Sequence, residues 1–262
     1  MFKIRFVYFL LLCFPLVISA DFFYTAVMEK QTGISDQEWV SKAKLKHLHH
    51  AITTGWKEGY GIIDVSHSPR RWSVVLSRGT GIDKQLYMSR RLIAEFDGAT
   101  RYYLKRGYEV INVENGVGEW LAVFQKGGEY HGTSMNITRD LAKMQEIIKE
   151  REEAGFSLID MEAAEGQWVA LFAKKVPFVR SYYTTAADWD EVEKLIDKAW
   201  KNGDRVLNLE YGANAWFVLF AQYDQAHGQR VIRNKSFQRL RAAVRQGWKE
   251  GYRLTDLGEG RK

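Results

Sequence analysis

The chain has 262 residues, of which 46% are hydrophobic and only three are proline, so it can bury a sizeable core and has no proline-rich linker. Its formal net charge of +6 comes from interspersed Lys, Arg, Asp and Glu, and this pattern gives no support for nucleic-acid binding. The single cysteine, Cys13, lies in the N-terminal segment described next, so the rest of the chain excludes disulfides, thiolate metal sites and cysteine nucleophiles.

Residues 1–20 have the pattern of a secretory signal peptide. A basic start with Lys3 and Arg5 is followed by an apolar run and by small residues that end at Ala20. An uncleaved membrane anchor is the alternative, but the apolar run is shorter than the roughly 20 residues that a spanning helix needs. We therefore expect cleavage after Ala20 and a secreted or periplasmic mature chain, 21–262, without a membrane span.

The rest of the chain repeats every 48 residues without insertion or deletion. Glycine and an aromatic residue recur at fixed places, and such regularity indicates a modular repeat fold. The glycines are Gly59, Gly107, Gly155, Gly203 and Gly251, and the tryptophans are Trp72, Trp120, Trp168 and Trp216.

Each unit contains three expected strands. The first follows the glycine, as in 60–65, and the second, as in 72–76, is apolar on both faces like a central strand. A third, weaker strand lies near 85–89 and its equivalents. One column of apolar residues runs through the third strands, so we expect them to be half exposed.

A helix of about four turns closes each unit. Its apolar residues are spaced i, i+3 and i+7, as in Leu45, Leu48 and Ile52. The glycine that opens the next unit is the stop signal, because glycine adopts the left-handed conformation at a helix C-terminus without a Cβ penalty.

The two ends of the mature chain complement each other. Tyr24 aligns with Trp72, so the first segment is a second strand, whereas 251–257 is a first strand with nothing after it. We expect these two strands to pair and close a ring within one domain. The units are 59–106, 107–154, 155–202, 203–250, and 251–262 combined with 21–58.

These elements predict an α+β fold in which each unit is a three-stranded meander plus a helix. We expect a closed five-bladed α/β-propeller with pseudo-fivefold symmetry. The blade content resembles the pentein fold, although the catalytic cysteine of that family has no counterpart here. The alternative is a ten-stranded barrel with outer helices, if the weak third strand is a loop.

One motif resembles a known family. It is Gly-Trp-Lys-Glu-Gly-Tyr at 55–60, repeated at 247–252, together with Trp-Ser-Val-Val-Leu-Ser at 72–77. It resembles an uncharacterised repeat domain found C-terminal to the kinase in plant casein-kinase-I-like proteins and in some bacterial caspase-like proteins. The likeness spans the mature chain and is strongest in the first unit. The resemblance implies a binding or regulatory module, and it assigns no catalytic residues to this chain.

The most uniform polar column lies at the end of the first strand, where every unit has Asp or Asn. If these strands line an axis, five carboxylates and amides converge, which would raise carboxyl pKa values or recruit a cation. The alternative, which we favour, is that each side chain caps the turn that follows it. The column consists of Asp64, Asn112, Asp160, Asn208 and Asp256.

Other candidates favour structural roles. We expect Glu114, Glu162 and Glu210 to be solvated turn residues, and the repeated tryptophans to be wedges between blades rather than sugar platforms. His47 and His50 belong to the solvent face of a helix.

The main polar departure from the repeat is His67, Arg70 and Arg71 in the first turn, a second candidate ligand site. No nucleophile elbow, P-loop or dinucleotide fingerprint is present, so we expect no cofactor and have no metal site to assign.

The sequence therefore favours a non-enzymatic binding scaffold, a monomer, for a protein or carbohydrate partner. The repeat design and the lack of a unique catalytic cluster carry this hypothesis. The alternative is a hydrolase or cation-dependent enzyme that uses Asp64, Asp160 and Asp256 at the axis.

Overall fold

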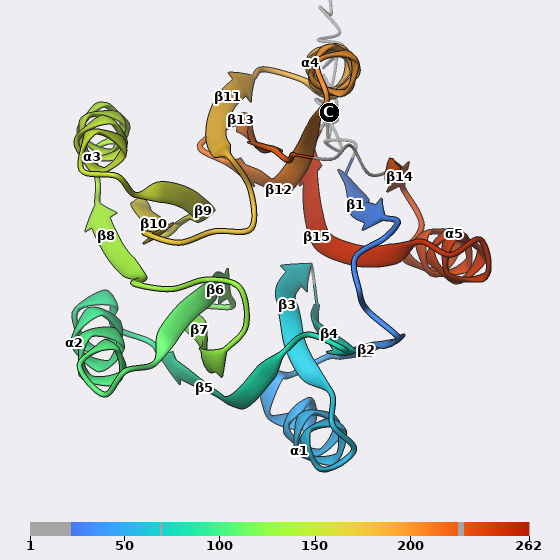
Figure 1. The fold of residues 1–262 in the computed structure, drawn as a ribbon, viewed down its shortest axis with the longest axis horizontal. Helices are drawn as coiled ribbons and strands as arrows, with labels where there is room; N and C mark the ends of the chain where they lie inside the picture. Colours follow the sequence, from blue (N-terminus) through green and yellow to red (C-terminus); the bar gives the residue numbers. More distant parts are fainter. Residues whose placement is uncertain (1–21, 69, 225–227, 262) are drawn as a thin grey trace, which may run out of the picture.

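The structure is a computed structural model that describes residues 22–68, 70–224 and 228–261. The expected signal peptide lies outside these residues. The described chain forms five three-stranded antiparallel sheets, each accompanied by a helix. Figure 1 shows the sheets arranged around a common centre, with the helices outermost. The inner strands contact one another in a complete circle, in the order β3, β6, β9, β12, β15 and back to β3.

We call each sheet with its helix a module. We number the modules 1 to 5 by the order of their outer strands in the chain. Modules 1 to 4 contribute an outer strand, a helix, an inner strand and a middle strand in this order, whereas the middle strand of module 5 comes from the N-terminal end of the described chain. The sheet order is outer, middle, inner in all five. The outer strands are β2 (Asp36–Lys42), β5 (Ile82–Arg90), β8 (Ser134–Thr138), β11 (Arg180–Ala186) and β14 (Gln229–Asn234). The helices are α1 (His49–Lys57), which follows the 3-10 turn η1 (Leu45–His47), α2 (Ile93–Leu104), α3 (Leu141–Glu153), α4 (Trp189–Lys201) and α5 (Phe237–Lys249). The inner strands are β3 (Gly61–Ser68), β6 (Glu109–Gly116), β9 (Ser157–Ala164), β12 (Asp204–Gly212) and β15 (Arg253–Arg261). The middle strands are β4 (Arg71–Arg78), β7 (Glu119–Gly127), β10 (Gln167–Ala173), β13 (Ala215–Gln222) and β1 (Phe22–Glu29).

This strand order shows that the expected meander is wrong. The weak third strand of each sequence unit is a true strand, but it joins the sheet of the next unit: β5 pairs with β7, not with β4. The outer and inner strands both run antiparallel to the middle strand, so they are parallel to each other. Parallel strands need a long crossover, which the helix supplies. Because the third strands are not loops, the ten-stranded barrel loses its basis.

The fifth module joins the two ends of the described chain. β1 lies between β14 and β15, and Val27 faces Val231 on one side and Asp256 on the other. The expected pairing of the N-terminal and C-terminal strands is therefore confirmed.

The stop signals form as expected, and so do the helices of modules 2 to 5. In module 1 the helix is shorter than expected, because Leu45 lies in η1 and the nine-residue α1 begins after Leu48. Leu48 and Ile52 of the first helical segment are fully buried, as are the equivalent residues Met144 and Ile148. All five repeated glycines have φ between 71° and 86°, the left-handed conformation that ends each helix. None of the helices in the described ranges combines the length and the apolar character that a membrane span requires.

Each inner strand contains a β-bulge at the residue before the Asp/Asn column. In β3, the register with β4 skips Ile63, so Ile62 and Val65 point to the same hydrophobic cluster although they are three residues apart. A regular strand, with its period of two, would send them to opposite faces. The same skip occurs in all five modules.

A glutamine on the outer strand ties neighbouring modules together. Gln85 of β5 accepts from the backbone N–H of Ile62 at 2.6 Å, donates to the carbonyl of Ile62 at 2.6 Å, and accepts from the indole of Trp56. Gln37 and Gln229 make the equivalent bonds in their modules. These contacts satisfy backbone groups on the free edge of the inner strand.

The repeated tryptophans pack between modules, as expected for wedges. Trp120 and Trp216 are fully buried, and Trp72 is 2% exposed. Small residues on the next inner strand make room for the indoles: a Cβ on Gly116 would overlap Trp72, and a Cβ on Gly260 would overlap Trp216. The tryptophans are therefore part of the core.

Candidate functional site

The Asp/Asn column converges at the centre of the ring. The Nδ2 of Asn112 donates to Oδ1 of Asp64 at 3.3 Å, and the Nδ2 of Asn208 donates to Oδ1 of Asp160 at 3.1 Å and to Oδ1 of Asp256 at 3.3 Å. All these partners belong to adjacent modules. The five residues thus form one axial ring, which we call the Asx ring.

Four of the five ring residues also hold a neighbouring inner strand through a side-chain oxygen. Asp160 accepts from the backbone N–H of Val113 at 2.8 Å, and Asp64 accepts from the backbone N–H of Leu257 at 3.1 Å. Asn112 and Asp256 make the same type of bond to Val65 and Leu209. The favoured expectation that each side chain caps its own turn does not describe these four residues fully, because each binds the backbone of a neighbouring module. Asp64 and Asp160 also accept from the residue that follows them in their own strand.

A second layer of carboxyls lies two to three residues further along the inner strands. Glu162 is 5% exposed, and it accepts from the backbone of Asn115 as Glu210 does from that of Ala163. Burial raises the pKa of Glu114, Glu162 and Glu210, and repulsion from neighbouring carboxylates raises each further. The expectation of solvated turn residues is therefore wrong.

The axial carboxyls have higher pKa values than carboxyls that are exposed to water. Burial raises the pKa of Asp160 to about 7 and that of Glu259 to about 9. Burial, followed by the charges of Asp256 and Asp160, raises the pKa of Asp64. Among the described residues, no group of His, Cys, Asp and Glu has a geometry that could hold a metal ion.

Of the polar group in the first turn, two side chains pack against aromatic rings. His67 stacks edge-on against Trp72, with ring centroids 4.9 Å apart, and burial lowers its pKa. Arg71 lies over the ring of Phe237 at 4.2 Å, in the seam with module 5, while Arg70 is exposed in a turn with φ 73°. His67 and Arg71 therefore have separate partners and act in packing.

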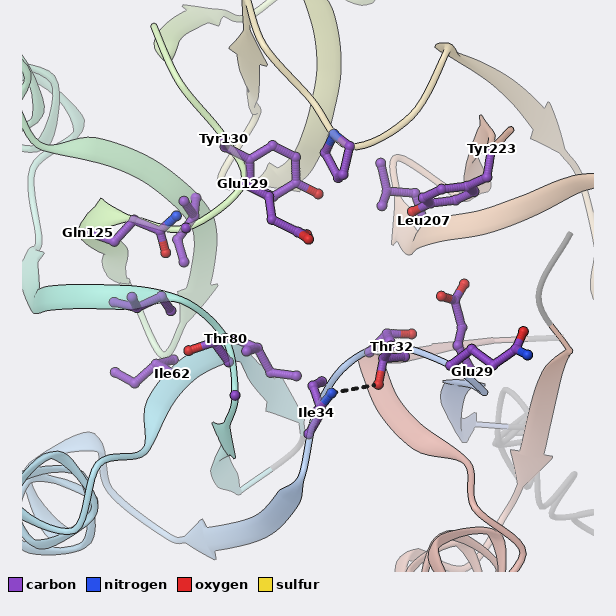
Figure 2. A pocket seen from close by; sticks show the side chains of 18 of the residues that line it. Glu29, Thr32, Ile34, Ile62, Thr80, Gln125, Glu129, Tyr130, Leu207 and Tyr223 are labelled. Carbon is purple, nitrogen blue, oxygen red and sulfur yellow. Dashed lines mark hydrogen bonds between the residues drawn. The ribbon is translucent and has the colours of Figure 1, made fainter. Parts of the chain in front are cut away.

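A pocket with a volume of about 330 Å³ opens at the end of the axis where the inner strands begin. Its inner wall includes the bulge residues Ile63, Ile111, Leu207 and Thr255, each one residue before the Asx ring. Figure 2 shows its labelled side chains around a central space. We call this the axial pocket.

The rim of the axial pocket comes from the connections between modules. All five contribute: Thr32 follows β1, Thr80 follows β4, Tyr130 follows β7, Pro177 follows β10 and Tyr223 follows β13. The pocket is therefore a product of the complete ring, because no single module could enclose it.

The charged groups of the axial pocket are acidic. Glu29 and Glu129 are among its lining residues, whereas the part of the lining that the structure describes includes no Lys, Arg or His. Burial raises the pKa of Glu29 to about 7, against a hydrogen bond from Gln229 and the charge of Arg205, which lower it. Burial also raises the pKa of Tyr130 and of Tyr223, so both phenols stay protonated.

Sequence reasoning missed this pocket because its polar residues lie outside the repeated columns. Tyr130 and Tyr223 stand in connections whose residue types differ from one module to the next. Aromatic and acidic residues in these variable connections are the signal that could have identified it.

A protein-family model described as "Domain of unknown function (DUF7477)" matches residues 16–189, more than half of the chain. The match ends at the start of α4, although the structural repeat continues to residue 261. No curated protein matches the chain at a significant level. The chain belongs to the DUF7477 domain family.

Proposed function

We propose that this protein is a closed five-bladed α/β-propeller of the pentein-like type that acts as a non-enzymatic binding module. The observation that carries the proposal is the axial pocket, to which all five connections contribute. Binding sites in proteins are concave, mostly apolar and equipped with a few polar groups, and the axial pocket has this composition. The segment 1–20 supports export, so the partner is a protein or carbohydrate outside the cytoplasm.

The resemblance to repeat domains attached to kinases and caspase-like proteins fits this role. A module that accompanies different enzymes is expected to bind rather than to catalyse. The hydrolase alternative has less support, because Asp64, Asp160 and Asp256 each bind a backbone N–H or an amide of the next module. A general base or nucleophile needs a lone pair that faces its substrate.

The proposal is tested by screening the protein on glycan and peptide arrays. Tyr130→Ala and Tyr223→Ala should abolish binding of any hit that occupies the axial pocket. Tyr102→Ala is the matched control, because Tyr102 is 49% exposed on the outer helix α2. Hits that all survive both pocket substitutions would refute the axial pocket as the binding site. Turnover in a hydrolase screen that Asp160→Asn removes would refute the non-enzymatic reading.

A further inference from the structure

We infer that the axial pocket selects small organic cations, that is, ammonium groups carried on an apolar body. This inference rests on the proposed function and adds the chemistry of the ligand. Its first support is the charge of the lining. The chain has 38 Lys and Arg residues, yet the lining of the axial pocket, within the described residues, contains two glutamates and no basic side chain.

The two glutamates and the two tyrosines of the pocket form one electrostatic group. The charges of Glu29 and Glu129 both act on the phenols of Tyr130 and Tyr223, although the four residues come from three different modules. In Figure 2 the hydroxyl of Tyr130 and the carboxylate of Glu129 point toward the centre of the pocket. A cation at this centre would be stabilised by both carboxylates and by the negative faces of the aromatic rings.

The empty pocket is energetically unfavourable when Glu29 is ionised. Its side chain is 9% exposed, and Gln229 donates to one carboxylate oxygen. Arg205 is the cation that acts on Glu29, but it donates to the carbonyl of Asp204 and is not part of the lining. Burial of a carboxylate is costly, because the pKa of Glu29 stays raised despite the charge of Arg205, and a bound ammonium group would offset that cost.

The remaining walls set the size and the apolar character of the ligand. Ile63, Ile111 and Leu207 close the inner end, and Ile34 and Ile82 line the side. The volume of about 330 Å³ suits an organic molecule rather than a bare ion. The Asx ring lies beyond this wall, and the charge of Asp160 still acts on Tyr130, which adds to the negative potential.

A charge series of similar shape tests the inference: 2-phenylethylammonium, 2-phenylethanol and 3-phenylpropanoate, titrated by calorimetry and ligand-observed NMR at low salt. We expect the ammonium compound to bind at least ~10-fold more tightly than the alcohol, since ~1.4 kcal/mol corresponds to tenfold, and the carboxylate not to bind. Glu129→Gln should bring the ammonium compound down to the level of the alcohol. Tyr102→Ala, on the outer helix, should change neither affinity.

Three results would overturn the inference. These are an alcohol that binds as well as the ammonium compound, a preference that survives both Glu129→Gln and Glu29→Gln, or no binding of any probe. If no probe binds but an array ligand is lost in Tyr130→Ala, only the cation preference fails and the binding module stands. If the array ligands also ignore the pocket substitutions, the proposed function fails with it.

Discussion

The backbone N–H of Leu257 donates to Oδ2 of Asp64 at 3.1 Å, across 193 residues of sequence. This bond joins module 5 to module 1 and completes the Asx ring. A ring of five cannot alternate Asp and Asn throughout, so two like residues must meet. They meet here, where the charge of Asp256 raises the pKa of Asp64.

The first prediction concerns this mismatch. Asp256→Asn removes one of the two adjacent carboxyls and keeps an oxygen that can accept from Leu209, so we expect stability to be unchanged or to rise by about 1 kcal/mol at pH 8. Asp256→Ala leaves the N–H of Leu209 unsatisfied and should cost about 1–3 kcal/mol. Urea denaturation of both variants is the measurement. Equal losses for the two substitutions would contradict the ring geometry.

The second prediction is that the protein loses stability as pH rises. The folded-state pKa is about 7 for Asp160 and Glu29 and about 9 for Glu259, all above the unfolded values near 4. Between pH 4 and the folded-state pKa values, the folded chain therefore binds more protons than the unfolded chain. The stabilisation from these three carboxyls is complete below pH 4 and is lost as the pH rises through 7 to 9.

Thermal unfolding measured between pH 5 and pH 8.5 tests this pH dependence. We expect Tm to be higher at pH 5 by at least ~5 °C, given that about 1 kcal/mol corresponds to ~2–4 °C in a domain of this size. Asp160→Asn should flatten the profile because one titrating carboxyl is removed. A Tm that rises steadily toward pH 8.5 would show that the carboxyls are ionised without cost.

The third prediction concerns the tryptophan wedges. Gly260→Ala places a methyl group on the indole of Trp216 and should destabilise the protein by about 1–3 kcal/mol through overpacking. Gly98→Ala is the matched control, because it lies in α2 with open space around its Cα and gains helix propensity. Chemical denaturation should separate the two variants clearly. An unchanged free energy of unfolding in Gly260→Ala would mean that the packing between modules adjusts to the added methyl group.

The fourth prediction concerns the glutamine that ties modules 1 and 2. Gln85→Ala leaves the N–H and carbonyl of Ile62 and the indole N–H of Trp56 without this partner, and we expect a loss of about 2–3 kcal/mol. Gln85→Thr should cost less, because Thr133 at the equivalent position already accepts from the N–H of Val110 at 2.8 Å. Hydrogen exchange at Ile62 measures the local effect. Unchanged protection in Gln85→Ala would rule out this role.

The sequence by itself determined the five repeats, the element types, the helix ends and the pairing of the terminal strands. Each depends on local patterns: glycine at a left-handed φ, apolar residues at helical spacing, and an aromatic at a fixed place. The sequence also singled out Asp64 and its equivalents as the most uniform polar column, and it favoured the turn that follows each residue as the hydrogen-bond partner.

Only the tertiary structure decided which partner that is, and where a ligand could bind. The strand order depends on the helical crossover, which places each third strand beside the next unit. The bulge at Ile63 reverses the alternation of the strand and turns Asp64 toward the axis, and no local signal marks a bulge. The axial pocket brings Glu29, Tyr130 and Tyr223 together from distant connections. Closure of the ring creates that neighbourhood, so it has no counterpart in the linear chain.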